Sequence, residues 1–292
     1  MVKRHHARVL VTHGPTVAAW CALFARLLRI RAPIFAHTFN FTQIPSPVKR
    51  RVFGLLFRNV SKFVVFSTME RDLYSRVFRL PPERFDVVLW GVRPPAVTQP
   101  DAPLERKPYI CAIGGNARDY RTLLDAAGRL PYVRFVVVVR PENLRGLTVP
   151  NNVAVHTNIP VGAAMNILFH SSFMVLPLMG SQVPCGHVTL VAAMHLSKAM
   201  VITDSSGVRD YARHGENALI VPTGSTSDLV SAIQKLWTDA ALCAQLGKNG
   251  KDFAAHECSE ARIVEHFRLW LESNHIGTKT LPMALHAANC PD

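Results

Sequence analysis

Two short segments of the chain combine residue types that suit an anionic ligand. The first, residues 113–120 (IGGNARDY), follows an apolar run and precedes a helical pattern. Its polar and flexible positions are Gly114, Gly115, Asn116 and Arg118. The glycines allow close backbone approach, the arginine offers paired N–H donors to phosphate, and Asp119 or Asn116 can cap the helix. GxGxxG spacing is absent, which argues against a nicotinamide-dependent enzyme.

The second segment lies between the apolar run at 173–178 and a helix that we expect to begin near His187. The residues of this turn with candidate ligand contacts are Gly186, His187, Val188, Thr189 and Leu190. A loop that opens a helix presents free N–H groups and the positive end of the helix dipole, which together favour an anion. An ordinary turn between a strand and a helix is the alternative interpretation.

The elements that position both turns read as strands alternating with helices. Such alternation predicts an α/β fold with a mostly parallel sheet covered on both faces. Both turns then open at the carboxyl ends of strands, where these sheets bind ligands. His13 and His37 also follow strand-like runs, so either could face that cleft as a base, or simply cap a loop.

We expect a helix over 240–246, closed by Gly247.

A proline-rich stretch divides the chain of 292 residues. We predict a first domain over 1–91, a linker over 92–107 and a second domain over 108–256. A helix over 257–275 and a disordered tail over 276–292 follow. The six cysteines are scattered and form no CxxC pair, so we expect no metal site and a reducing, cytoplasmic location.

Positive charge is concentrated in the first third of the chain. Up to residue 105 there are sixteen basic against six acidic residues, and seventeen against fourteen follow. Within this third, residues 48–62 mix apolar and basic side chains, a pattern that suits an anionic membrane surface. The same pattern also fits a helix packed on a sheet. Few aromatic residues are interleaved with the basic ones elsewhere, which disfavours nucleic acid as a partner.

Several segments together resemble the GT-B glycosyltransferases, in particular glycosyltransferase family 4. In the second domain these segments are GGNARDYRTLLDAA (114–127), CGHVTLVAAM (185–194), VITDSSGVRDYARHGENALIVPTG (201–224) and the run 229–250. The first domain resembles the later part of the family's acceptor-binding domain, and the last helix resembles the one that crosses back to it. The resemblance implies two Rossmann-like domains with parallel sheets.

The resemblance also implies a function. It predicts transfer of a sugar from a nucleoside diphosphate sugar, UDP- or GDP-linked, to a glycan or lipid-linked acceptor, with retained configuration and without metal or other cofactor. Arg118 aligns with the family's phosphate-binding cation, and His37 is the candidate acceptor-side base. A lipid-linked acceptor implies a peripheral position at the inner membrane face, in polysaccharide biosynthesis.

The chain departs from the family in two ways. The family's usual pair of glutamates, with seven residues between them, falls on Pro184 and Ala192. Because the second glutamate normally binds the donor ribose, a catalytically weak or inactive homologue is the alternative; His187 is a candidate substitute. The first domain is also shorter than the family norm, which predicts an unpaired sheet edge and either a fragment or an internal start.

Overall fold

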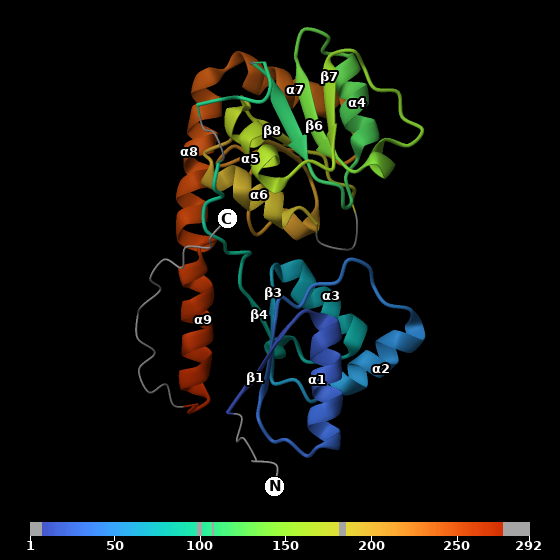
Figure 1. Ribbon diagram of the computed structural model, residues 1–292, viewed down its shortest axis with the longest axis vertical. Coiled ribbons are helices and arrows are strands. Elements are labelled where there is room, and N and C mark those ends of the chain that lie inside the picture. Colours follow the sequence, from blue (N-terminus) through green and yellow to red (C-terminus); the bar gives the residue numbers. More distant parts are fainter. Residues whose placement is uncertain (1–7, 98–100, 107, 181–184, 277–292) are drawn as a thin grey trace.

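The computed structural model describes residues 8–97, 101–106, 108–180 and 185–276. Two α/β lobes lie one above the other, with two long helices running down one side of both (Figure 1). The fold class predicted from the sequence, two parallel-sheet Rossmann-like units of GT-B type, is confirmed. The lobes correspond to the two predicted domains, whose residue limits stay a prediction. Pro184 and the predicted tail beyond Ile276 lie outside the described residues.

The first lobe is a four-stranded parallel sheet in the order β1-β2-β3-β4. Its elements are β1 (Leu10–His13), α1 (Pro15–Leu27), β2 (Ile34–His37), α2 (Pro47–Phe57), β3 (Lys62–Val65), α3 (Thr68–Phe78), a 3-10 turn η1 (Pro82–Arg84) and β4 (Phe85–Val87). Aromatic side chains dominate the core between the sheet and its three helices, with Phe39 fully buried at its centre. In the described chain β1 is an edge strand, and its Val11 is 54% exposed.

The second lobe is a six-stranded parallel sheet in the order β10-β9-β8-β5-β6-β7. Its elements are β5 (Ile110–Ile113), α4 (Tyr120–Gly128), β6 (Phe135–Val139), η2 (Pro141–Leu144), β7 (Val153–Thr157), α5 (Val161–His170), β8 (Met174–Leu176), α6 (His187–His195), β9 (Met200–Thr203), η3 (Ser206–Val208), β10 (Leu219–Val221), α7 (Thr226–Thr238) and α8 (Ala240–Glu257). Both faces are covered: one core contains α4 and α7 side chains, and the other contains α5 and α6 side chains.

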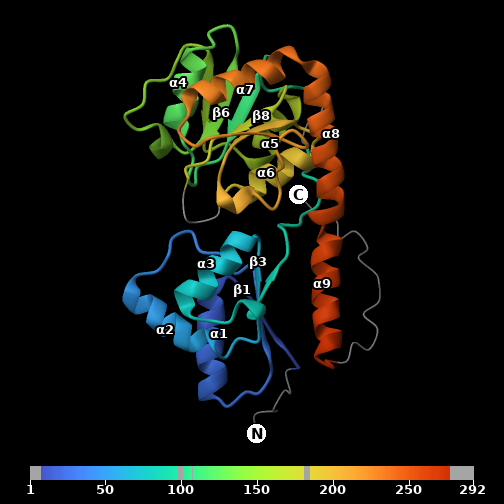
Figure 2. The same ribbon diagram turned by 180° about the vertical axis from the view of Figure 1, so that it is seen from behind.

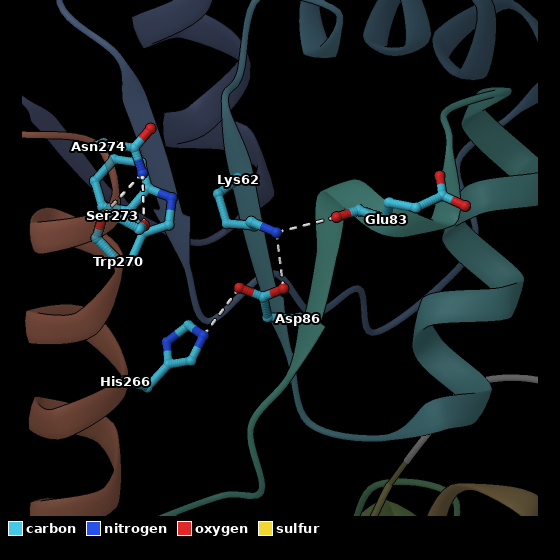
Figure 3. Close-up of polar contacts among 7 residues, drawn as sticks. All are labelled: Lys62, Glu83, Asp86, His266, Trp270, Ser273 and Asn274. Carbon is cyan, nitrogen blue, oxygen red and sulfur yellow. Dashed lines mark hydrogen bonds and ion pairs between the residues drawn. The ribbon is translucent and has the colours of Figure 1, made fainter.

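The last helix, α9 (Glu260–Ser273), returns to the first lobe and covers the face of its sheet opposite α1–α3 (Figures 1 and 2). Trp270 and Leu271 of α9 pack against Phe35 of β2. His266 bonds to the Asp86 carboxylate at 2.9 Å, and Lys62 reaches the same carboxylate at 2.8 Å (Figure 3). The helix therefore fastens to the first sheet through an apolar contact and a partly buried polar contact.

The helix expected over 240–246 is longer than predicted. It continues through Gly247 to Glu257 as α8. A Cβ at Gly247 would lie 2.2 Å from the Ser197 carbonyl oxygen, so this glycine allows close packing on the loop after α6. The prediction that Gly247 ends the helix is wrong because this packing, rather than a helix cap, requires the glycine.

No helix in the described part of the chain has both the length and the apolar content needed to cross a membrane.

Candidate functional site

The two predicted turns meet at the point where the strand order of the second sheet reverses. β5 and β8 are neighbours there, and strands are added outward on either side of them. The loops after these strands are joined by hydrogen bonds, from Asp119 N to Pro177 O (2.8 Å) and from Met179 N to Ala117 O (3.0 Å). Open parallel sheets bind ligands at such a switch point. The loops therefore form a single binding surface.

A cavity of about 870 Å³ lies between this surface and the first lobe. From the second lobe it is lined by Gly114, Gly115, Asn116, Ala117, Arg118, Arg140, Cys185, Gly186, His187, Val188 and Thr189. The first lobe and the crossing segment contribute Thr38, Asn40, Thr42, Gln43, Phe66 and Trp90. Eight of the nine predicted second-lobe residues thus share one cleft; the exception is Leu190.

Arg118 is a buried cation without a carboxylate partner among the described residues. It is only 5% exposed, and burial lowers the pKa of its guanidinium. Nη1 donates to Asn116 O at 2.8 Å and Nη2 to Thr189 Oγ1 at 3.4 Å, while the buried Nε has no partner. A buried charge is costly unless it is paired. The geometry therefore favours an anion in the cleft.

Gly114 makes room for this guanidinium. Its φ is +121°, and a Cβ at this position would stand 2.7 Å from Arg118 Nη2. Gly115 is similarly crowded, since its Cβ would lie 2.8 Å from Asn143 Oδ1. Asp119 accepts a bond from Thr122 N at 3.1 Å, which confirms it as the cap of α4. Each glycine of the predicted segment is thus required by a close contact.

The N-terminus of α6 opens into the same cleft. Gly186 is its N-cap with φ +102°, and no side chain caps the first turn. The N–H groups of this turn have no intrahelical acceptor, and Gly186, Val188 and Thr189 line the cleft. Leu190 differs, because its N–H donates to Gly186 O at 2.9 Å and its side chain is fully buried. The N–H groups without an intrahelical acceptor therefore come from Gly186 to Thr189, and a ligand contact by Leu190 stays a prediction.

His187 is largely structural. Its side chain is buried, Nε2 donates to Gly207 O at 2.7 Å, and the ring centroid lies 4.9 Å from that of Tyr211. Burial lowers the pKa of this imidazole, so the neutral ring is favoured. The bond fixes the tautomer and leaves Nδ1 as an acceptor.

His37 lies at the end of β2, beside the cleft but not among its lining residues. Its Nδ1 bonds to Thr38 Oγ1 at 2.7 Å, and its buried Nε2 has no partner among the described residues. Burial, together with nearby His13 and His266, lowers the pKa of the His37 imidazole. The neutral form that a base requires is favoured, and the neighbouring Thr38 reaches the cleft.

Sequence reasoning missed several residues on the cleft. Arg140, exposed just after β6, adds a second cation to the cleft lining, and Asn40 lines the cleft from the first lobe. Behind Asn40, the fully buried Glu70 accepts a bond from Asn40 Nδ2 at 2.5 Å. The segments AHTFNFT and MER contain Asn40 and Glu70, but only the folded chain places these two residues together. No cluster of three or more metal-ligand side chains occurs within the described ranges.

Ala192 lies one turn into α6, on the helix face that Val188 and Thr189 present to the cleft. It is 7% exposed and packs in the apolar core of the lobe. The described cleft therefore has no carboxylate at the position where a ribose ligand is expected.

Comparison with known proteins agrees with this geometry. Residues 107–239 match the family described as Glycosyl transferases group 1. EpsD of Bacillus subtilis (strain 168), a protein assigned by name to the glycosyltransferases, is 26% identical over 152 residues. That match covers 52% of this chain and 33% of the relative, so the chain spans about a third of that protein.

Two solved structures share the fold over most of the chain. Sucrose-phosphate synthase from Thermosynechococcus elongatus is 16% identical, with a TM-score of 0.76, and the match covers 94% of this chain and 75% of that one. HepE of Anabaena, solved in complex with UDP-glucose, is 16% identical with a TM-score of 0.75, covering 90% and 78%. The chain therefore has the GT-B fold, and its second lobe is similar to the glycosyl transferases group 1 family over residues 107–239.

Proposed function

We propose that the chain binds a nucleoside diphosphate sugar, UDP- or GDP-linked, and transfers its sugar to a glycan or lipid-linked acceptor. One observation carries the proposal: Arg118 is buried without a carboxylate partner at the switch point, beneath the uncapped N-terminus of α6. A diphosphate supplies the charge that this arrangement lacks. HepE, which shares the fold, was solved in complex with UDP-glucose, and this supports a nucleotide sugar as the donor.

The catalytic contribution is electrostatic. When the sugar leaves, negative charge develops on the departing diphosphate. Arg118 and the N–H groups of Gly186 to Thr189 are fixed in place to stabilise that charge, so no reorganisation is needed at the moment of reaction. Because these groups already neutralise the leaving group, we propose a metal-independent reaction. Retention of configuration follows from the family resemblance.

On the acceptor side, we propose that His37 acts as the base, with Thr38 between it and the cleft. The neutral imidazole can accept the Thr38 hydroxyl proton at Nδ1 while the Oγ1 of Thr38, which lines the cleft, accepts the proton of the acceptor hydroxyl. The exposed apolar stripe Val48, Val52 and Leu55 on α2 supports a peripheral position on an anionic membrane surface through residues 48–62. A cytoplasmic, inner-face location is part of the same proposal.

A catalytically weak or inactive homologue is the alternative, and Ala192 favours it. The two possibilities differ in whether the cleft binds nucleotide at all. Isothermal titration with UDP and with GDP separates them. If neither nucleotide binds this chain but one binds Ala192→Glu, the loss of the carboxylate has disabled the site.

The decisive variant is Arg118→Met, which removes the charge and keeps most of the volume. UDP or GDP affinity is expected to fall about 10- to 100-fold, the value of a charge-assisted hydrogen bond. Without nucleotide, the midpoint temperature of thermal unfolding is expected not to fall in this variant, because the unpaired buried charge that it removes destabilises the folded state. Arg121→Met, exposed on α4, is the matched control. Equal nucleotide affinity in both variants would exclude Arg118 as the diphosphate-binding group.

A further inference from the structure

A second basic cavity lies between α2 and α3 on the first lobe, away from Arg118. Its volume is about 850 Å³, and we call it the α2–α3 groove. Five arginines line it: Arg50, Arg51, Arg58, Arg76 and Arg79. Apolar side chains, including Leu55 and Leu73, and close backbone contact at Gly54 complete its walls. Its lining residues run from Pro47 to Leu55 on α2 and from Met69 to Phe78 on α3, two helices that are neighbours in the first lobe (Figure 1).

No carboxylate compensates this charge. None of the lining residues is acidic, and none of the five arginines has an ion-pair partner within the described chain. Arg50 Nε donates to the Pro45 carbonyl and Arg76 Nε to the Asp72 carbonyl, contacts that position the side chains without neutralising them. The remaining guanidinium donors face open space, since four of the five residues are exposed.

Helix-dipole complementarity does not explain the cluster. Arg58 and Arg79 follow the C-terminal ends of their helices, where cations are favourable. Arg50 and Arg51, in contrast, lie in the first two turns of α2, and no acidic residue occupies its first turn. Positive charge at a helix N-terminus is unfavourable. Arg50 and Arg51 therefore gain nothing from the dipole of α2, and negative charge brought into the groove would stabilise them.

The groove begins next to the interdomain cleft. Phe66, just before α3, lines the cleft, and Met69, in the first turn of α3, lines the groove. Ser206 of η3, from the second lobe, also lines the groove. The cleft and the groove therefore lie on either side of the start of α3, where Thr68 bonds to Asp210 of the second lobe.

We propose that the α2–α3 groove binds phosphate groups of the acceptor. This rests on the transferase function proposed above and adds that the acceptor is a phosphate ester or diphosphate. Paired guanidinium donors match phosphate oxygens, and the apolar walls accommodate a hydrocarbon portion beside them. The phosphate could belong to a lipid headgroup or to a water-soluble phosphorylated glycan, and both present the same chemistry to the arginines.

The test uses the full chain and three variants. Arg51→Gln with Arg76→Gln removes two groove cations, and Arg121→Gln with Arg129→Gln removes two exposed cations from the second lobe. Arg118→Met reports on the donor cleft. Each protein is titrated with inorganic pyrophosphate and sedimented with phosphatidylcholine vesicles that contain or lack phosphatidic acid. Far-ultraviolet circular dichroism checks that the proteins are folded.

We expect the groove variant to lose pyrophosphate affinity about tenfold or more, because charge-assisted bonds are lost, while the second-lobe variant stays close to the parent. If groove-dependent binding appears only with phosphatidic acid vesicles, the phosphate is that of a lipid headgroup, and the proposal holds. Equal losses in the two double variants, or losses confined to Arg118→Met, would overturn it. UDP titration is a separate readout: failure to bind UDP contradicts the donor site without affecting the groove result.

Discussion

At the scale of single residues, Glu70 shows how burial changes chemistry beside the cleft. Its carboxyl is fully buried in the first turn of α3 and accepts bonds from Phe66 N (2.7 Å), Ser67 Oγ (3.1 Å) and Asn40 Nδ2 (2.5 Å). Burial raises the pKa of Glu70 to about 7, and the hydrogen bonds only partly oppose this shift. A carboxyl that titrates near neutrality therefore lies directly behind Asn40.

This shift predicts a pH-dependent stability with a definite sign. In the unfolded chain the carboxyl ionises near the ordinary glutamate pKa of 4.5, and in the folded chain near 7, so the folded state binds more protons between these values. The contribution of Glu70 to the free energy of unfolding is therefore most favourable below pH 4.5. It declines as the pH rises from 4.5 to 7 and is constant above pH 7. Its upper size is about 3 kcal/mol.

Urea unfolding at pH 5 and pH 7.5 tests this prediction. Glu70→Gln is expected to lose less stability than the parent between the two pH values, because the titrating group is gone. The exposed Glu142→Gln serves as control and is expected to keep the parent's slope. If Glu70→Gln has that same slope, Glu70 does not titrate in this window.

At the scale of elements, glycine in α8 shows a limit of sequence reasoning. A glycine after a run of good helix formers commonly ends a helix, yet α8 continues through Gly247. This position is glycine because Ser197 O leaves no room for a Cβ. α1 gives a second example. Its buried face consists of Ala18, Ala19, Ala22 and Ala25, while its large apolar residues are exposed, Trp20 by 56%. Small residues let this helix lie close to the sheet.

Gly247→Ala is expected to destabilise the protein despite the better helix propensity of alanine. The propensity gain is about 1 kcal/mol, but a Cβ at 2.2 Å from a backbone oxygen forces the loop after α6 to shift, at a cost of about 2 kcal/mol or more. Gly128→Ala at the end of α4 is the control, since its Cβ would meet only Pro150 at 3.8 Å. Urea denaturation should show a net loss for the first variant and none for the second. Equal stability in both would contradict the close contact.

At the scale of the whole molecule, hydrogen bonds join the lobes at the start of α3. Asp210 of the second lobe accepts from Thr68 N at 2.7 Å and from Thr68 Oγ1 at 2.8 Å. Tyr211 Oη donates to Phe66 O at 2.7 Å and accepts from Trp90 N at 2.8 Å. These contacts hold the lobes together at the wall between the cleft and the α2–α3 groove.

Replacing Asp210 with alanine is expected to loosen this contact. Thr68 N loses its acceptor at the first turn of α3, at a cost of about 1.5–3 kcal/mol for a bond to a charged group. Hydrogen exchange should become faster in the first turn of α3, and small-angle scattering should show a larger radius of gyration. Asp204→Ala, which removes an exposed pair with Arg209 within the second lobe, is the control. Exchange that is equally fast in both variants would show that Asp210 does not hold the lobes together.

The sequence by itself determined the alternation of strands and helices, the two glycine-containing turns and the position of the cationic Arg118 in the first of these turns. These follow from local patterns: hydrophobic periodicity, turn residues and residue chemistry within a few positions of one another. It also showed that Ala192 stands where the family has a carboxylate.

Only the tertiary structure decided which of these groups meet. The strand order places the loops after β5 and β8 side by side, although about sixty residues separate them. It also leaves Arg118 buried without a carboxylate partner among the described residues, fixes His187 on Gly207, and brings arginines from two helices into one groove. Burial and partnership depend on atoms distant in sequence, so no local pattern determines them; they arise when the chain packs.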